Sequence, residues 1–188
     1  MKLAIVLLAA GLSRRFGSRD KLMAQLEGRP LAAHSLAALR GLPRHAAFVV
    51  LRHPGHAGLY RGMIPVRTPK ARAGQGISLA IGIRAVRRSG ASHVLLVLAD
   101  MPRLTRSDLR LVARGALTHP VMALGGVAMP PAIIPRALFP RVMRLDRDKG
   151  AGALLRERPD LILRAIPADR LVDVDRPGDL PNTRMQAI

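Results

Sequence analysis

The chain contains no cysteine, and this absence excludes several kinds of protein at once. A disulfide framework, a thiolate metal site and a cysteine nucleophile are all ruled out, whereas the redox compartment is left open. Aromatic residues are scarce as well, with one Tyr, three Phe and no Trp, so Leu, Val, Ile, Ala and Met must build the core. The longest apolar run, Leu3 to Leu12, is far shorter than the roughly 20 residues that cross a bilayer, so we expect no membrane span.

Acidic residues are few: 12 Asp and Glu stand against 31 Lys and Arg, and the formal net charge is +19. A balance of this kind favours polyanionic partners such as nucleotides, phosphorylated substrates or nucleic acid. No basic tail, aromatic-interleaved strand or recognition-helix pattern accompanies the charge, so we expect no dedicated nucleic-acid binding. A solvated exterior rich in Arg, whose stems cover apolar surface, explains most of the excess.

The 188 residues fit one domain, 1–188, and their apolar runs alternate with helical stretches. That alternation predicts an α/β fold in which a mostly parallel, Rossmann-like sheet lies between two layers of helices. The first run, Leu3–Leu8, imitates the apolar part of a secretory signal, but the loop-like Ser13–Gly17 that follows favours a buried first strand.

The same patterns place the individual elements. Strands are expected at Leu3–Leu8, Ala46–Leu51, Met63–Val66, Val94–Leu98, Val121–Leu124, Ile162–Ile166 and Leu171–Val174. Helices are expected at Pro30–Arg40, Ile77–Arg88, from a Thr105–Asp108 capping box to about Leu117, at Ala137–Leu145 and at Gly150–Arg156. Residues 125–148, rich in Pro and Arg, are expected to be less regular.

The turn after the first strand is the strongest candidate for a phosphate site. Ala9-Ala10-Gly11 is a small-residue turn whose N–H groups can form an anion-binding concavity. Arg14, Arg15 and Lys21 then supply cations that could wrap a triphosphate. The stretch is neither a P-loop nor a dinucleotide fingerprint, because both of those glycine patterns are absent. A plain strand-to-helix loop remains the alternative.

Carboxylates follow two other apolar runs. Asp100, before Met101-Pro102, can hold Mg²⁺, which takes one or two protein carboxylates and completes its shell with water and phosphate. Asp173 and Asp175 alternate with apolar residues, so both would project from one face of the expected strand. We favour Asp175 over Asp173 as the second ligand; the alternatives are an ordinary turn at Asp100 and a polar strand face at Asp173.

Two further stretches carry polar groups. Gly76 and Ser78 begin a helix, where backbone donors and the hydroxyl could bond a base or ribose. His53 and His56 have no obvious third ligand, so a surface loop is preferred to a zinc site.

Apart from His53 and His56, the residues singled out above belong to an ordered set of short motifs that runs through nearly the whole chain. The set comprises Leu8-Ala9-Ala10-Gly11-Leu12-Ser13-Arg14-Arg15-Phe16-Gly17, Lys21, Gly28-Arg29-Pro30-Leu31, Gly76-Ile77-Ser78-Leu79, Asp100-Met101-Pro102, Phe139, Asp148-Lys149-Gly150-Ala151 and Asp173-Val174-Asp175-Arg176-Pro177-Gly178-Asp179-Leu180. It resembles the molybdenum cofactor cytidylyltransferases, in the MobA-like nucleotidyltransferase superfamily, with Phe16 replacing the usual Met.

The resemblance implies a cytoplasmic, Mg²⁺-dependent enzyme of the nucleotide-diphospho-sugar transferase fold, which transfers a nucleotidyl group to a phosphorylated acceptor. Molybdopterin would be the acceptor, pyrophosphate the product, and a molybdoenzyme or its chaperone a possible partner. Ala10, where guanylyltransferases tend to carry a second Gly, favours CTP. The implied catalytic residues are Arg15 and Lys21, the metal ligands Asp100 and Asp175, and the nucleotide-binding residues Leu8, Ala9, Ala10, Gly11, Ser13, Arg14, Gly76 and Ser78.

One segment departs from the family pattern. Where relatives carry G-x-P-V-L-[FW], beside the acceptor, this chain has Gly126-Val127-Ala128-Met129-Pro130-Pro131-Ala132-Ile133-Ile134. The alternatives therefore include a guanylyltransferase, a sugar- or isoprenoid-phosphate cytidylyltransferase, and a relative that binds nucleotide or molybdopterin without turnover.

Overall fold

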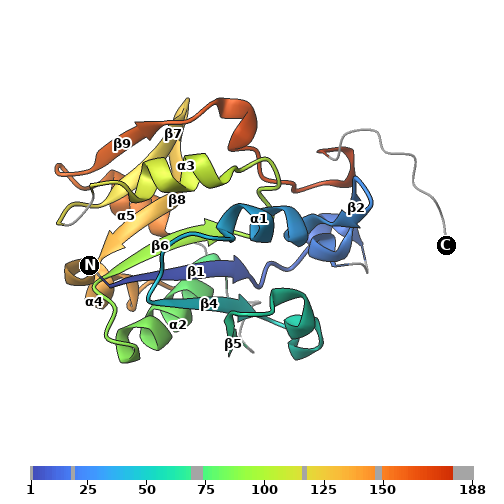
Figure 1. Ribbon diagram of the computed structural model, residues 1–188, viewed down its shortest axis with the longest axis horizontal. Helices are drawn as coiled ribbons and strands as arrows, with labels where there is room; N and C mark the ends of the chain where they lie inside the picture. The colour runs from blue at the N-terminus through green and yellow to red at the C-terminus, as the bar shows by residue number, and fades with distance from the viewer. Residues whose placement is uncertain (1, 18–19, 69–73, 116–117, 147–149, 180–188) are drawn as a thin grey trace.

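The computed structural model describes residues 2–17, 20–68, 74–115, 118–146 and 150–179. Its centre is a seven-stranded sheet in the order β5-β4-β1-β6-β8-β7-β9, shown in Figure 1. Every neighbouring pair is parallel except those made by β8, so the predicted α/β fold with a mostly parallel sheet is confirmed. The strands are β1 (Leu3–Ala9), β4 (Ala46–Leu51), β5 (Ile64–Arg67), β6 (His93–Leu98), β7 (Val121–Gly125), β8 (Val127–Pro135) and β9 (Ile162–Ala165).

Helices cover both faces of the sheet (Figure 1). On one face α1 (Leu31–Leu39) contacts α3 (Arg106–Ala113), and on the other α2 (Gln75–Arg88) contacts α4 (Phe139–Val142). The short α5 (Ala151–Arg156) packs on β8, and a hairpin of β2 (Gln25–Leu26) and β3 (Arg29–Pro30) precedes α1. Short 3₁₀ helices lie at Arg14–Phe16, Lys21–Met23, Pro54–Tyr60, Arg136–Leu138, Ala168–Arg170 and Pro177–Asp179.

The core is centred on β1 and β6, in which every residue is buried. Both strands have a sheet neighbour on each side and helices above and below, which explains why they are continuous apolar runs. The helix α2 lies very close to this sheet at Gly82. A Cβ there would stand 2.9 Å from a methyl carbon of Val50 and 3.1 Å from one of Val6, so only glycine fits without displacement.

Helix boundaries agree with the sequence to within a few residues. Thr105 and Asp108 form the predicted capping box at the start of α3. That helix ends at Ala113, before Gly115 takes a φ of 72°, which is earlier than the predicted Leu117; residues 116 and 117 lie outside the described part. α2 begins at Gln75, two residues before the predicted Ile77. No helix among the described residues is both long enough and apolar enough to span a bilayer.

The strand β8 was missed, because the sequence indicated an irregular stretch over 125–148. Pro130 and Pro131 interrupt the strand pattern in the sequence. In the structure they lie at an irregularity of β8, where the β7–β8 register shifts between Met122 and Ala123. The pairing with β6 begins only at Ala132, so neither proline is required to donate to that ladder. The Met129–Pro131 departure is thus accommodated as an irregularity inside a strand.

The prediction of a strand at Leu171–Val174 is wrong. This stretch joins neither described sheet and runs as extended chain across the end of β6, where the N–H of Val174 donates to the carbonyl of Asp100 at 2.9 Å. Alternating apolar and acidic residues imitate a strand here, but the apolar member Val174 is buried in a separate small cluster. The argument that Asp173 and Asp175 share one face of a strand therefore fails.

Candidate functional site

The carboxyl ends of β1, β4 and β6 meet at one edge of the sheet, where open α/β folds bind ligands. Two segments far apart in the sequence come together there (Figure 1). One is the first loop, defined as residues 10–21, of which 18 and 19 lie outside the described part. The other is the C-terminal segment, defined as residues 171–179.

The first loop is closed by its own polar groups. Ser13 takes a left-handed conformation with φ of 50°, and its Oγ accepts from the N–H of Lys21 at 3.0 Å. The same hydroxyl donates to Asp20 Oδ1 at 3.3 Å, and this carboxylate accepts from the N–H of Leu22 at 3.0 Å. These bonds fix the backbone of Lys21, so Ser13 positions the loop through its side chain.

Lys21 is the centre of the site. Its side chain is only 9% exposed, and its Nζ lies 2.6 Å from Asp100 Oδ2 and 3.2 Å from Asp175 Oδ1. The ammonium also donates to the carbonyl of Val174 at 2.9 Å. Burial by itself lowers the pKa of Lys21, but the Asp100 carboxylate, followed by Asp175, outweighs burial and raises that pKa above its usual value. The structure therefore holds a charged ammonium between two predicted metal ligands.

Asp100 reaches this position because it follows the last residues of β6. The buried Ser35 of α1 fixes the turn, since its Oγ lies 3.1 Å from the carbonyl oxygen of Ala99 and 3.0 Å from that of Met101. One carboxylate oxygen, Oδ2, pairs with Lys21, while Oδ1 is buried and has no hydrogen-bond partner among the described residues. A buried carboxylate oxygen without a donor is costly and is suited to receive a cation.

Arg15 contacts the site from the solvent side. Its Nη1 lies 2.8 Å from Asp175 Oδ2, with the two side chains 58% and 48% exposed. An ion pair as exposed as this contributes little to stability. The guanidinium is therefore free to exchange its partner for an incoming anion at small cost.

Asp173 lies near the same charges without joining the described ion pairs. Loss of hydration beside the other acids, and then the negative charges of Asp100 and Asp175, raise the pKa of Asp173 above its usual value. The site thus carries three carboxyl groups, one of which is disfavoured in its charged form.

The C-terminal segment is held by an apolar anchor. Val174 is buried with Leu26 and Leu31, and Phe16 packs against this small cluster. On the polar side, Asp179 Oδ2 accepts from the N–H groups of Asp175 and Arg176 at 2.8 and 2.7 Å. The cluster connects the segment to α1 and to the first loop, so it sets the position of Asp175.

The other predicted nucleotide-binding residues lie at the same edge. Leu8, Ala9 and Ala10 are buried at the end of β1, and Gly11 follows exposed. The backbone N–H groups of Gly11 and Leu12 donate to no acceptor within the described ranges. Arg14 starts the 3₁₀ turn Arg14–Phe16, but its side chain lies outside what the structure describes.

Gly76 and Ser78 form a second part of the edge. Both are buried in the first turns of α2, which starts at the carboxyl edge because it follows β5. Gly150 lies against this helix start, since a Cβ there would stand 2.6 Å from Gln75 Oε1. Neither Gly76 nor Ser78 takes part in the contacts of Lys21.

Asp20 and His56 were not predicted as part of the site. His56 Nδ1 lies 3.2 Å from Asp20 Oδ2, which links the turn Pro54–Tyr60 after β4 to the first loop. The sequence suggested only a surface loop around His56. Asp20, next to Lys21, was available as a capping signal for the turn Lys21–Met23, but its partner lies 36 residues further on and no local pattern indicates it.

The carboxylates of this site suit a divalent cation that binds together with the phosphates of a ligand. No group of three or more His, Cys, Asp or Glu able to hold a metal occurs in the described ranges. Asp100 and Asp175, with the unpaired Asp100 Oδ1, fit Mg²⁺, which typically binds through one or two carboxylates plus water and substrate phosphates.

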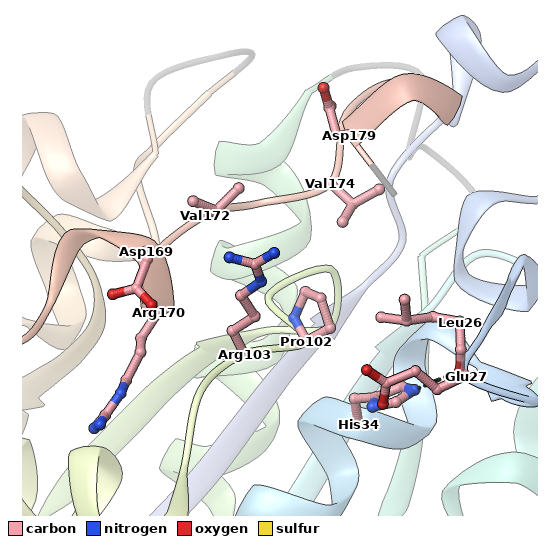
Figure 2. A pocket seen from close by; sticks show the side chains of 10 residues that line it. All are labelled: Leu26, Glu27, His34, Pro102, Arg103, Asp169, Arg170, Val172, Val174 and Asp179. Atoms are coloured by element: carbon pink, nitrogen blue, oxygen red, sulfur yellow. Dashed lines mark hydrogen bonds between the residues drawn. The ribbon is translucent and has the colours of Figure 1, made fainter. Parts of the chain in front are cut away.

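A cavity of about 410 Å³ lies beside this site on the α1 side of the C-terminal segment. Figure 2 shows Val172 and Val174 on one side of it, with Pro102 and Arg103 facing them. It shares Leu26 and Val174 with the cluster that anchors the C-terminal segment but includes none of Arg15, Lys21, Asp100 and Asp175. The remaining lining residues are Glu27, His34, Asp169, Arg170 and Asp179.

An open, mostly parallel sheet whose first turn carries cations opposite two carboxylates is an arrangement typical of α/β proteins that bind phosphorylated ligands. Comparison with known sequences narrows this class: the MobA-like NTP transferase domain matches residues 5–162. The chain belongs to the MobA-like nucleotidyltransferase family, as its motifs indicated.

Individual relatives agree with this assignment. The chain is 32% identical to the purine catabolism protein PucB of Bacillus subtilis, over 95% of this chain and 94% of that protein. It is 31% identical to a molybdenum cofactor guanylyltransferase of Bradyrhizobium, over 66% of each. Among solved structures, Rv0371C of Mycobacterium tuberculosis in complex with manganese superposes with a TM-score of 0.77 at 21% identity, over 95% of this chain and 96% of that one, which supports the fold.

Proposed function

We propose that this protein transfers CMP from CTP to a phosphorylated acceptor, molybdopterin being favoured, and releases pyrophosphate. The observation that carries the proposal is the meeting of Arg15 and Lys21 with Asp100 and Asp175 at the carboxyl edge of the sheet. Cations suited to a triphosphate and carboxylates suited to its metal are what this reaction requires, since phosphoryl chemistry depends on positioning and charge neutralisation.

In the proposed reaction an oxygen of the acceptor phosphate attacks the α-phosphorus of CTP. The new bond joins that oxygen to the α-phosphorus, and the bond to the bridging oxygen of the β-phosphate breaks, so pyrophosphate leaves. The N–H groups of Gly11 and Leu12 donate hydrogen bonds to phosphate oxygens of the nucleotide. Arg15 and Lys21 stabilise the negative charge that develops on those oxygens. Asp100 and Asp175 would hold Mg²⁺, which neutralises triphosphate charge when bound.

The other assigned residues have supporting roles in this proposal. Leu8, Ala9 and Ala10 bring the turn to the nucleotide, Ser13 fixes the loop, and Arg14 adds a further cation. Gly76 and Ser78, at the start of α2, contact the base or ribose. Residues 1–188 would act as one domain, because the family match covers 5–162 and the segment beyond it supplies Asp175. An enzyme that consumes nucleoside triphosphates is expected in the cytoplasm.

Ala10 supports cytidine in this proposal, because a residue with a Cβ replaces the glycine that guanylyltransferases tend to carry. The second candidate is guanylyl transfer, favoured by the similarity to the Bradyrhizobium molybdenum cofactor guanylyltransferase. The two candidates share the phosphate and metal residues and differ only in the base, so a comparison of CTP binding with GTP binding separates them.

The test is calorimetric titration with CTP, GTP and ATP, each with and without Mg²⁺, followed by a pyrophosphate-release assay with molybdopterin. Asp100→Ala is the site variant and Asp146→Ala, an exposed acid, is the matched control. We expect Mg²⁺-dependent binding of CTP that is lost only in Asp100→Ala. Preference for GTP would select the second candidate. Nucleotide binding without release of pyrophosphate from the nucleotide, whichever acceptor is supplied, would indicate a non-catalytic nucleotide-binding relative.

A further inference from the structure

The Lys21 ammonium occupies the place that the proposed function gives to a metal. Its Nζ is surrounded by three oxygens, Asp100 Oδ2 at 2.6 Å, the carbonyl of Val174 at 2.9 Å and Asp175 Oδ1 at 3.2 Å. Two of these belong to the proposed metal ligands. Carboxylate and carbonyl oxygens are also the donors preferred by Mg²⁺ and Mn²⁺.

An ammonium and a divalent cation cannot both occupy such a place. A metal held by both carboxylates would lie next to the Lys21 ammonium, and their like charges repel strongly where the Lys21 side chain is only 9% exposed. A metal can bind Asp100 and Asp175 together only if the ammonium leaves.

The structure also provides a place for the ammonium to go. A Cβ on Gly11 would stand 3.8 Å from Lys21 Cε, so the stem of Lys21 passes beside the turn proposed to receive phosphate. The backbone of Lys21 is held by the Ser13 hydroxyl, which accepts from its N–H, and by Ala24, whose N–H donates to its carbonyl. The end of the side chain is held only by the three oxygens around Nζ, and phosphate oxygens can replace these. Rotation about the last bonds of the stem would therefore move Nζ from the carboxylates to a phosphate near Gly11 without moving the loop.

We infer that Lys21 is an exchangeable placeholder for the metal: in the nucleotide-free protein its ammonium neutralises Asp100 and Asp175, and it turns to the triphosphate when the metal–nucleotide complex binds. Metal without nucleotide is excluded, and metal and nucleotide enter together. This inference rests on the proposed function and adds to it an order of binding.

The first test measures Mn²⁺ binding to the nucleotide-free protein by calorimetry and by the electron paramagnetic resonance signal of free Mn²⁺. We expect Lys21→Met to bind Mn²⁺ at least about tenfold more tightly than the wild type, because the metal no longer competes with the ammonium for the carboxylates. Tenfold corresponds to the strength of about one charge-assisted hydrogen bond. Arg158→Met is the matched control, because Arg158 Nε pairs with Asp160 Oδ1 at 2.8 Å, and it should bind as the wild type does. Equal or weaker binding by a folded Lys21→Met protein would overturn the inference.

The second test uses the wild-type chain and therefore does not depend on whether Lys21→Met folds. The sequence contains only four lysines, so a spectrum of the protein labelled with ¹³Cε-lysine has few signals, and Lys21→Arg identifies that of Lys21. We expect this signal to stay in place with Mg²⁺ alone and to shift with Mg²⁺ and CTP. A signal unchanged at saturating Mg²⁺–CTP would refute the exchange.

The two proposals can fail separately. Tighter Mn²⁺ binding by Lys21→Met together with no binding of CTP, GTP or ATP would support the placeholder and contradict the nucleotidyl-transfer proposal. Pyrophosphate release by the wild type, with unchanged Mn²⁺ affinity in folded Lys21→Met, would support transfer and overturn the placeholder.

Discussion

The two segments that form the site, the first loop and the C-terminal segment, are fixed in different ways. In the first loop the Ser13 hydroxyl bonds to both the Asp20 carboxylate and the Lys21 N–H, which lie seven and eight residues further on. The C-terminal segment is fixed by contacts that are far away in sequence, with Val174 packed on Leu26 and Leu31 and its N–H bonded to Asp100. The cations of the site therefore come from a locally determined loop, and Asp175 from a segment placed by tertiary packing.

Because the two segments are fixed differently, we expect some substitutions to change activity without stability and others to change stability as well. Changes to polar groups of the first loop should act locally, whereas removal of the apolar anchor should displace Asp175 and destabilise the packing around it.

The largest effect is expected for Arg15→Ala, which removes the exposed cation of the first loop. Because its pair with Asp175 is exposed, stability should change by less than about 1 kcal/mol. Turnover should fall roughly 100- to 1,000-fold if the guanidinium stabilises developing phosphate charge. Pyrophosphate release and urea denaturation measure the two effects, with Arg158→Ala as control. Wild-type turnover in Arg15→Ala would remove Arg15 from the catalytic assignment.

The second effect concerns the anchor of the C-terminal segment. Val174 is 2% exposed and Val172, on the same segment, is 43% exposed. Val174→Ala should lower the free energy of unfolding by about 2 kcal/mol, through lost burial and a residual cavity. Val172→Ala should change it by less than about 0.5 kcal/mol. Urea denaturation distinguishes the two, and equal losses would mean that Val174 is no special anchor.

A smaller effect is expected in the first loop from Asp20→Ala. This substitution removes the acceptor for the Leu22 N–H and the Ser13 hydroxyl, and it also removes the contact with His56. Loss of such a cap should cost about 1 kcal/mol of unfolding free energy. Asp146→Ala provides the baseline for an exposed acid. If Asp20→Ala matched this baseline, the loop would not depend on its own hydrogen bonds.

The smallest effect is a pH-dependent gain from Asp173→Asn. Since the pKa of Asp173 is raised in the folded state, the folded protein is disfavoured once the pH exceeds the usual carboxyl value, and this penalty persists at higher pH. The variant should be more stable than the wild type at pH 7, and the difference should disappear as the pH falls below about 4, the usual value for Asp. If Asp173→Asn were less stable than the wild type at pH 7, the raised pKa of Asp173 in the folded protein would be contradicted.

Features fixed by local contacts could be predicted from the sequence, whereas features fixed by contacts far apart in the sequence could not. The strand β1 and the turn that carries Gly11, Arg15 and Lys21 could be predicted from the sequence, because buried runs and glycine turns are local patterns. Asp100 could be identified because it follows such a run directly. The link between His56 and Asp20 could not, because two separate turns must pack before it exists. The alternation around Asp173 predicted a strand wrongly, since burial of Val174 in a small cluster produces the same pattern without a sheet.

Local patterns in the sequence are sufficient to indicate the buried strands, the cationic turn and the family, because strand periodicity, glycine turns and capping pairs act over a few residues. The position of β8 between β6 and β7, despite Pro130 and Pro131, depends on tertiary packing, because its irregularity is matched by a register shift in a partner strand. Tertiary structure also brought Asp175 to Lys21, across 154 residues of sequence. Contacts over such distances depend on the packing of the whole sheet and its anchor, which no local pattern contains.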